Sequence, residues 1–250
     1  MAARLARIPA GYREILIFIG AYIAYSLVRG LAAGDEVAAV ENAEWVMGAQ
    51  ETLGIGIERG VQAALLDLPV MDLLNWIYLI AQFAVVPLAL VWMYRQNRQG
   101  YMVLRTTLLV AWFIALPIYW LVPTAPPRLS DAGFIDTVNS QTPLALDSPL
   151  VTAFYNPFAA IPSLHSAFAF TVGVALFLAT RHLWSRGIGL LWGPIVALAV
   201  IATGNHFVLD IVFGVAVAAV GALVAVWIHT PWRGPAALFS RREAAEAQRT

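Results

Sequence analysis

The sequence predicts an all-α, polytopic membrane protein with six transmembrane helices and an outer amphipathic helical segment. Hydrophobic residues make up 60% of the 250 residues and charged residues 12%, roughly half the charged fraction of an average soluble protein. A soluble globule could not cover its surface with so few polar side chains. The net charge is zero and there is no cysteine, which argues against a nucleic-acid-binding face, a disulfide framework and a thiolate metal site.

Six apolar segments are close to the length that a helix needs to cross the hydrocarbon of a bilayer, about 20 residues. Three of them run for 22 residues without a charged residue. Two others have a histidine as their only ionisable residue, and the first has a single arginine near its end. An even number of spans puts both termini on one side of the membrane. The predicted spans are residues 15–33, 73–94, 106–127, 163–180, 187–209 and 211–232.

The arginines predict the orientation of these spans. If both termini are cytoplasmic, 12 of the 15 arginines lie inside, as the positive-inside rule expects. The acidic residues contribute little to the sorting, but the outer location of 11 of the 15 agrees with the arginines. The three arginines left outside are Arg29, Arg59 and Arg128. We therefore expect a multi-pass protein of the cell membrane with cytoplasmic termini.

Three segments outside the predicted spans are not expected to cross the membrane. Residues 34–69 alternate acidic and apolar positions at helical spacing, which predicts one or two amphipathic helices on the outer surface. Residues 123–162 hold seven of the 14 prolines, which predicts an irregular outer connection. Residues 233–250 read as a polar cytoplasmic tail. We expect residues 1–250 to form a single membrane-embedded domain.

Ionisable residues within or beside the spans are candidates for a functional site, because lipid excludes them unless they have a partner or a wet cavity. His206 and Asp210 are four residues apart, which on a helix puts both on one face. The carboxylate can hold one imidazole nitrogen and leave the other free and more basic. The simpler interpretation is an acidic residue near the positive end of a helix.

Two further clusters lie at the outer ends of spans. In Asn156-Pro-Phe-Ala-Ala-Ile-Pro-Ser-Leu-His165, Ser163 can cap a helix whose free amides bind an anion, and His165 lies in its first turn. In Pro-Thr-Ala-Pro-Pro-Arg128, the guanidinium can grip phosphate oxygens through two donors. Alone, each cluster could be a cap or an interfacial side chain. Together, at one membrane face, they predict a phosphoryl-transfer site.

These motifs resemble the signature of the type-2 phosphatidic-acid phosphatase superfamily, and most closely its inositolphosphotransferase-like branch, which includes the inositol phosphorylceramide synthases. The resemblance implies that His206 is the nucleophile and forms a phosphohistidine, and that Asp210 orients it. It implies that His165 protonates the leaving alkoxide and then activates water or an acceptor hydroxyl. Ser163 and Arg128 would hold the phosphoryl oxygens.

The sequence departs from that signature at three positions. Leu121 and Val200 stand where the broader family has a lysine and an arginine, and Leu164 replaces a glycine. The missing cations must be replaced by other donors. Our candidates on the outer side are Arg29, Arg59, Asn205 and Asn156.

The predicted function is a lipid phosphatase or phosphotransferase that acts on a lipid phosphate or phosphodiester at the extracytoplasmic face. Water as acceptor gives a phosphatase, and a polyol or sugar gives a phosphotransferase. We expect no cofactor and no metal. The alternatives are a metal-dependent membrane hydrolase on the same residues, and a non-catalytic carrier that binds a lipid headgroup. Phe134, Phe154, Tyr155 and Phe158 could line the lipid's entry, although interfacial packing explains them equally.

Overall fold

The computed structural model describes residues 10–31, 35–130, 132–142 and 156–230. These residues form helices joined by short loops, with one isolated β-bridge and no strand within the described ranges. The elements are α2 (Ala10–Leu31), α3 (Glu36–Leu53), α4 (Glu58–Leu65), α5 (Val70–Ile80), η1 (Ala81–Val85), α6 (Val86–Gln96), α7 (Arg98–Leu121), η2 (Pro127–Leu129), α8 (Thr137–Gln141), α10 (Leu164–Ala179), α11 (Leu183–Ala202) and α12 (Val208–His229). The predicted all-α class is confirmed.

A helix coincides with each of the six predicted spans. In the part of the chain that the structure describes, four helices are long and apolar enough to cross a membrane: the continuous α5–η1–α6 rod, α7, α11 and α12. The other two apolar helices, Leu16–Val28 within α2 and α10, are shorter. A membrane protein is thus supported, and the number of six spans stays a prediction.

Two of the predicted spans have boundaries that are wrong. The helix expected over residues 106–127 begins at Arg98, because the Asn97 side chain accepts from the N–H of Gly100 at 2.9 Å and caps it, and it ends at Leu121, before the prolines. The helix expected over 187–209 ends at Ala202, because Gly204 takes a φ of +68° that turns the chain out of the helix. The residues that follow this turn form a loop.

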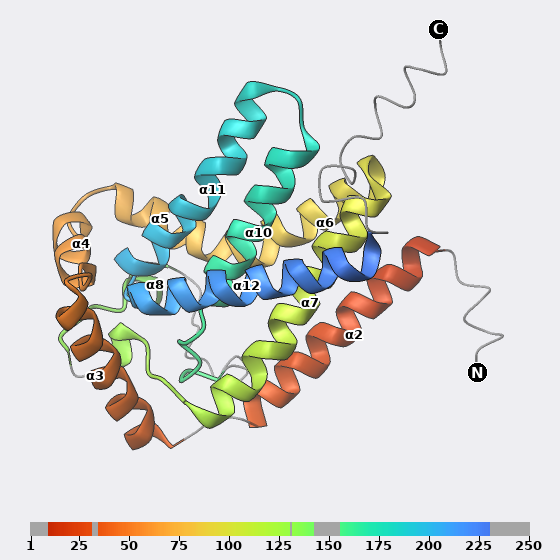
Figure 1. The fold of residues 1–250 in the computed structure, drawn as a ribbon. Helices are drawn as coiled ribbons and strands as arrows, with labels where there is room; N and C mark the ends of the chain where they lie inside the picture. The colour runs from red at the N-terminus through yellow and green to blue at the C-terminus, as the bar shows by residue number, and fades with distance from the viewer. Residues whose placement is uncertain (1–9, 32–34, 131, 143–155, 231–250) are drawn as a thin grey trace, which may run out of the picture.

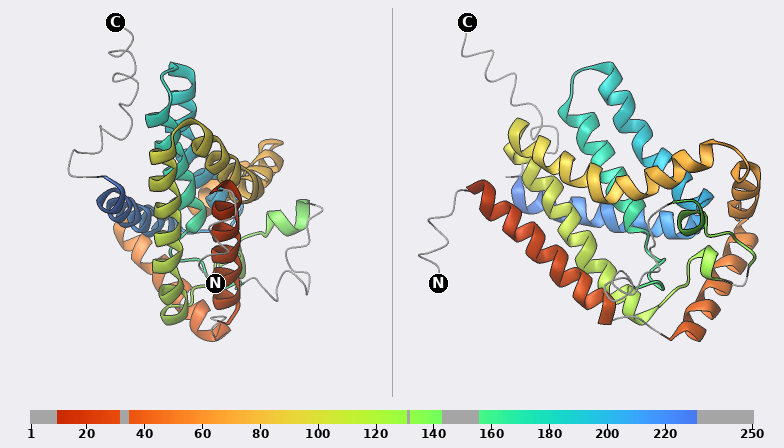
Figure 2. Two further views of the ribbon diagram at one scale, coloured as in Figure 1. Left: turned by 90° about the vertical axis from the view of Figure 1, so that its right-hand side faces the viewer. Right: turned by 180° about the vertical axis from the view of Figure 1, so that it is seen from behind.

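Close helix contacts bring the apolar helices together. The α10–α11 hairpin packs backbone to backbone at Gly173, where an added Cβ would lie 2.4 Å from the Gly189 carbonyl oxygen. Helix α12 crosses α7 at Gly221, which is similarly close to Thr107 (Figure 1). Figure 2 shows the α5–α6 rod crossing the far side of the molecule. The core between these helices holds Trp112 and Phe168, whose ring centroids lie 5.4 Å apart.

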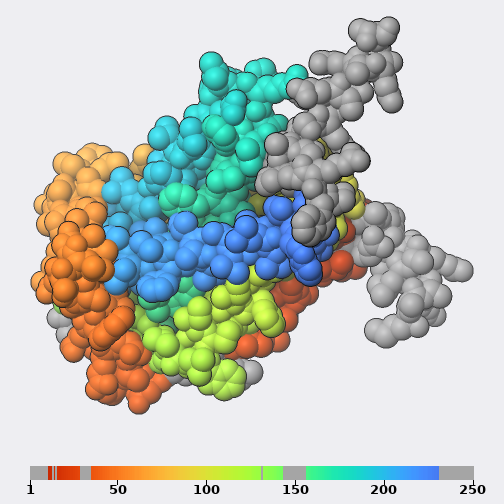
Figure 3. Space-filling model, in the orientation of Figure 1, coloured from red at the N-terminus to blue at the C-terminus, as the bar shows by residue number. Residues whose placement is uncertain are grey.

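The predicted amphipathic segment forms two helices, α3 and α4. The Asp35 side chain caps α3 by accepting from the N–H of Val37, and Gly54 ends the helix with a φ of 69°. Both helices pack at the end of the molecule where α11 ends and α12 begins, as the orange and blue surfaces show (Figure 3). Large apolar side chains such as Trp45 and Leu53 are exposed, which suits helices that lie in a membrane interface.

Buried charges link α2 and α7 well away from that end. The carboxylate of Glu14 pairs with Arg105 and accepts from the hydroxyl of Tyr101. Arg105 lies 16 residues before the end of α7, a distance of about 24 Å at 1.5 Å per residue. This pair therefore ties two helices together and takes no part in the cluster described next.

Candidate phosphoryl-transfer site

The loop between α11 and α12 carries His206. The backbone N–H groups of Asn205 and His206 both donate to the carbonyl of Val200, at 3.0 and 3.1 Å, so the loop folds back onto the end of α11. His206 is 6% exposed. The expectation that His206 and Asp210 share one helix face is wrong, because α12 begins only at Val208.

Asp210 nevertheless contacts His206, through a capping geometry. Its Oδ2 lies 3.2 Å from Nδ1 of His206 and accepts from the N–H of Phe207 at 2.9 Å. Asp210 is fully buried. A proton on Nδ1 held by this carboxylate leaves Nε2 with its lone pair. The sequence suggested two roles for Asp210, at the start of a helix and as partner of the imidazole. Its Oδ2 atom fulfils both.

Ser163 and His165 lie at the start of α10. The Ser163 hydroxyl accepts from the N–H of Ser166 at 3.3 Å, which confirms the predicted cap. The ring of His165 stacks on Tyr78 of α5 at 4.4 Å between centroids. It also faces His206, with the two imidazole centroids 6.0 Å apart and 53° between the ring planes.

At 6.0 Å between ring centroids, the imidazoles of His165 and His206 belong to one cluster. The two histidines come from separate motifs 41 residues apart, and the fold brings them together.

Arg128 joins the same cluster from η2. Its backbone N–H donates to the carbonyl of Gly204 at 2.9 Å. Its Nε donates to Oδ1 of Asn205 at 3.0 Å, and its Nη1 to Oδ2 of Asp136 at 2.9 Å. The side chain is 6% exposed. The guanidinium is therefore held in one orientation beside the His206 loop.

The two predicted amide donors have structural partners. Nδ2 of Asn205 donates to the hydroxyl of Thr203 at 2.9 Å, and its Oδ1 accepts from Arg128. Asn205 therefore orients Arg128 and is not the free donor that we expected. Oδ1 of Asn156 accepts from the N–H of Phe158 at 2.8 Å and forms a tight turn. The turn precedes the β-bridge from Ala159 to Thr124, which joins the two outer motif segments.

Arg59, one of the two predicted replacement cations, is not brought into the cluster. The guanidinium of Arg59 is exposed on α4 and lies 5.8 Å from the ring centroid of Phe134. The side chain of Arg29 lies outside the described residues, as do Phe154 and Tyr155. At the two positions without the family's cations, Leu121 is 80% exposed and Val200 is fully buried.

Sequence reasoning missed the polar residues on α3 and α4. Oε1 of Glu58 accepts from the N–H of Val208 at 2.7 Å, and Oε1 of Gln50 accepts from the N–H of Leu209 at 2.9 Å. Gln62 bonds to the carbonyl of Ala202 at 2.9 Å. A signal existed for Gln50, because it continues the buried stripe of α3, whose other members are Ala39, Ala43 and Val46.

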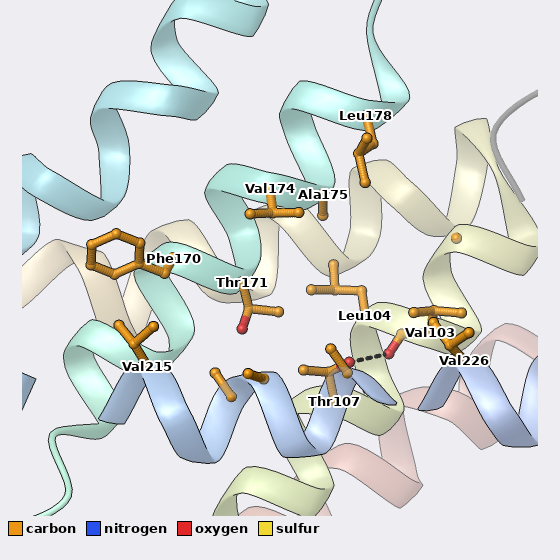
Figure 4. Close-up of a pocket in the computed structure, with 14 residues that line it drawn as sticks. Val103, Leu104, Thr107, Phe170, Thr171, Val174, Ala175, Leu178, Val215 and Val226 are labelled. Carbon is orange, nitrogen blue, oxygen red and sulfur yellow. Dashed lines mark hydrogen bonds between the residues drawn. The ribbon is translucent and has the colours of Figure 1, made fainter. Parts of the chain in front are cut away.

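An apolar groove of about 290 Å³ lies apart from this cluster, between α7, α10 and α12 (Figure 4). Its two hydroxyl groups, on Thr107 and Thr171, donate to carbonyls of their own helices, so the surface left to an occupant is hydrocarbon-like. None of the predicted site residues lines it.

The described helices thus gather two imidazoles, a carboxylate and a guanidinium in one cluster, a set of side chains that suits work on a phosphate group. Residues 44–224 match the family model of the PAP2 superfamily. The match covers more than half of the chain, and the protein belongs to this superfamily, whose members are phosphatases. No curated protein and no solved structure shows significant similarity to the chain.

Proposed function

We propose that the protein is a membrane-embedded lipid phosphatase or phosphotransferase that acts through a phosphohistidine on His206 at the extracytoplasmic face. The observation that carries this proposal is the pair of imidazoles 6.0 Å apart, with Nδ1 of His206 on Asp210. Membership of the PAP2 superfamily supports a phosphate-ester substrate. The apolar helices around the site support a lipid.

In the first half-reaction, the lone pair on Nε2 of His206 attacks phosphorus. The N–P bond forms while the ester P–O bond breaks, and protonated His165 gives its proton to the leaving oxygen. Holding the nucleophile and ester together contributes about 7–11 kcal/mol to lowering the barrier. The general acid adds a factor of about 10²–10⁴.

In the second half-reaction, His165 takes a proton from water or from an acceptor hydroxyl. That oxygen bonds to phosphorus while the P–N bond breaks and its electron pair returns to His206. Arg128 and Ser163 hold the phosphoryl oxygens. Arg59 and Arg29 remain our candidates for a contact with the substrate's headgroup, and Asn156 and Asn205 support the loops around the site.

The molecule that accepts the phosphoryl group decides whether the protein is a phosphatase or a phosphotransferase. The inositolphosphotransferase-like resemblance favours a polyol or sugar acceptor, and hydrolysis is the simpler reaction. Purified protein should be incubated with phosphatidic acid, polyprenyl diphosphate and phosphatidylinositol, with and without inositol. Release of free phosphate without inositol identifies a phosphatase, and product formed only with inositol identifies a transferase.

A phosphoenzyme test addresses the nucleophile. With labelled phosphatidic acid, the native protein should trap an acid-labile phosphate on histidine, and His206→Ala should not. His182→Ala is the matched control, because His182 is an exposed histidine before α11. Label that persists in His206→Ala contradicts the proposal, and turnover that survives this change contradicts it as well.

The two alternatives make different predictions in the same assay. A metal-dependent hydrolase loses activity with chelators, whereas the phosphohistidine enzyme keeps it. Within the described ranges, no group of three or more His, Asp and Glu side chains is arranged to hold a metal ion. A non-catalytic headgroup carrier would release no product from any of the three lipids.

The extracytoplasmic face can be tested by labelling, because the chain has no cysteine of its own. Ser140→Cys puts a thiol at an exposed position of α8, beside the proposed site, and Arg181→Cys puts one in the α10–α11 turn. An impermeant maleimide should label intact cells carrying Ser140→Cys and spare those carrying Arg181→Cys. The reverse pattern would put the site in the cytoplasm.

A further inference from the structure

The first turn of α12 is held by side chains from three different helices. A helix begins with backbone N–H groups that have no partner within the helix. Here Phe207 donates to Asp210 of α12 itself, Val208 to Glu58 of α4, and Leu209 to Gln50 of α3. Three consecutive amides are each taken by a separate acceptor.

The two acceptors from α3 and α4 are buried, Gln50 at 1% and Glu58 at 4% exposure. They lie 159 and 150 residues from the amides that they accept. Loss of the hydrogen bond to a buried polar group costs free energy, because the group then has no partner. These bonds therefore hold α12 against the outer helices, where the start of α12 lies beside α3 and α4 (Figure 1).

The segment that they hold follows His206 directly. The loop on the other side of His206 is already fixed by the Val200 carbonyl. With Phe207 to Leu209 fixed as well, the backbone of His206 has little freedom to shift relative to His165. The bond that the N–H of Val208 donates to Glu58 also helps to position Asp210, because Val208 and Asp210 belong to the same turn of α12.

Resting on the proposed function, we propose that Glu58 and Gln50 are positioning residues for the nucleophile: they hold the first turn of α12 so that Nε2 of His206 meets phosphorus in line with His165. They act as hydrogen-bond acceptors and do not touch the substrate. Their loss affects the chemical step more than substrate binding, since the Arg128 and Ser163 contacts remain.

The kinetic test uses full-length protein and phosphatidic acid. A misplacement of about 1 Å can cost about 10²-fold in rate, so Glu58→Ala and Gln50→Ala should each lower kcat by about ten- to hundredfold with little change in KM. Glu58→Gln keeps an acceptor oxygen and should restore most of the rate. Glu51→Ala, at an exposed position of α3, is the control and should behave as native protein. A variant that melts earlier yet keeps native kcat, or a Glu58→Gln that restores nothing, overturns the proposal.

A second readout does not depend on turnover. Hydrogen–deuterium exchange of peptides covering residues 205–212 should be slow in native protein and in Glu51→Ala, and fast in Glu58→Ala and Gln50→Ala. Unchanged protection in both alanine variants overturns the positioning role. If native protein turns over none of the lipids tested, the proposed function fails, and loss of protection still supports the part that Glu58 and Gln50 play in holding this turn.

Discussion

The backbone N–H of Ser163 donates to the carbonyl of Asp210 at 2.9 Å. Through this bond the first residues of α10 and α12 are joined main chain to main chain. Backbone contact between two helix starts therefore contributes to the separation of His165 and His206, together with the side-chain bonds of Glu58 and Gln50 to the first turn of α12.

Gly214 allows this contact. An added Cβ at Gly214 would lie 2.2 Å from the carbonyl oxygen of Ser163, so Gly214→Ala must push α10 away from α12. We expect a loss of stability of about 1–3 kcal/mol and a marked fall in kcat, measured by thermal unfolding and phosphate release. Gly187→Ala is the control, because that Cβ meets nothing within 4 Å. Equal kcat in the two variants would contradict this interpretation.

Asp210→Asn tests the link between the carboxylate and the imidazole. The asparagine oxygen can still accept from Phe207, but it no longer offers a charged acceptor to Nδ1 of His206. We expect kcat to fall by about 10²–10⁴-fold, by analogy with other aspartate–histidine pairs. The melting temperature checks that the fold survives. A variant with near-native kcat would mean that Asp210 serves the helix start alone.

Arg128→Lys tests the need for a forked cation. An ammonium cannot reproduce the separate bonds that Nε and Nη1 make to Asn205 and Asp136. Loss of one charged hydrogen bond is worth about 1.5–3 kcal/mol, so kcat/KM for phosphatidic acid should fall about ten- to hundredfold. Arg181→Lys changes an exposed arginine and should have no effect. If both variants match native protein, Arg128 does not hold the phosphate.

Glu14→Ala separates stability from activity. The change leaves Arg105 and the hydroxyl of Tyr101 without their shared acceptor. Breaking a buried ion pair costs about 3–5 kcal/mol, so the free energy of unfolding should drop strongly while kcat of the remaining folded protein is kept. Glu41→Ala, exposed on α3, should change neither quantity. A selective loss of kcat would tie this cluster to the reaction.

The sequence predicted the helical class and the meeting of the three motifs, because apolar runs and motif spacing are local signals. It failed at helix ends. The fifth predicted span runs to residue 209 because its sequence stays apolar, with His206 as its only ionisable residue. Hydropathy carries no information on backbone conformation, so it could not predict the turn at Gly204. The pairing of His206 with Asp210 was correct, although the geometry that produces it is a cap at the start of α12.

The supporting contacts could not be predicted in the same way. Glu58 and Val208 are 150 residues apart, and nothing in either local sequence indicates the other. Tyr78 lies in the site because its ring stacks on His165 at the start of α10, a tertiary contact that no sequence motif indicates. The sequences of α3 and α4 indicate only that these helices are amphipathic. The one local sign of a polar contact is Gln50, a polar residue in the otherwise apolar buried stripe of α3.

The order in which the chain is synthesised gives the contacts of α3 and α4 one more consequence. The ribosome makes Gln50 and Glu58 some 150 residues before the amides that they accept. Neither side chain can make its bond until α12 has been synthesised. A nascent chain that stops short of α12 lacks the amides that Gln50 and Glu58 accept from, so the segment beside His206 is left without these contacts.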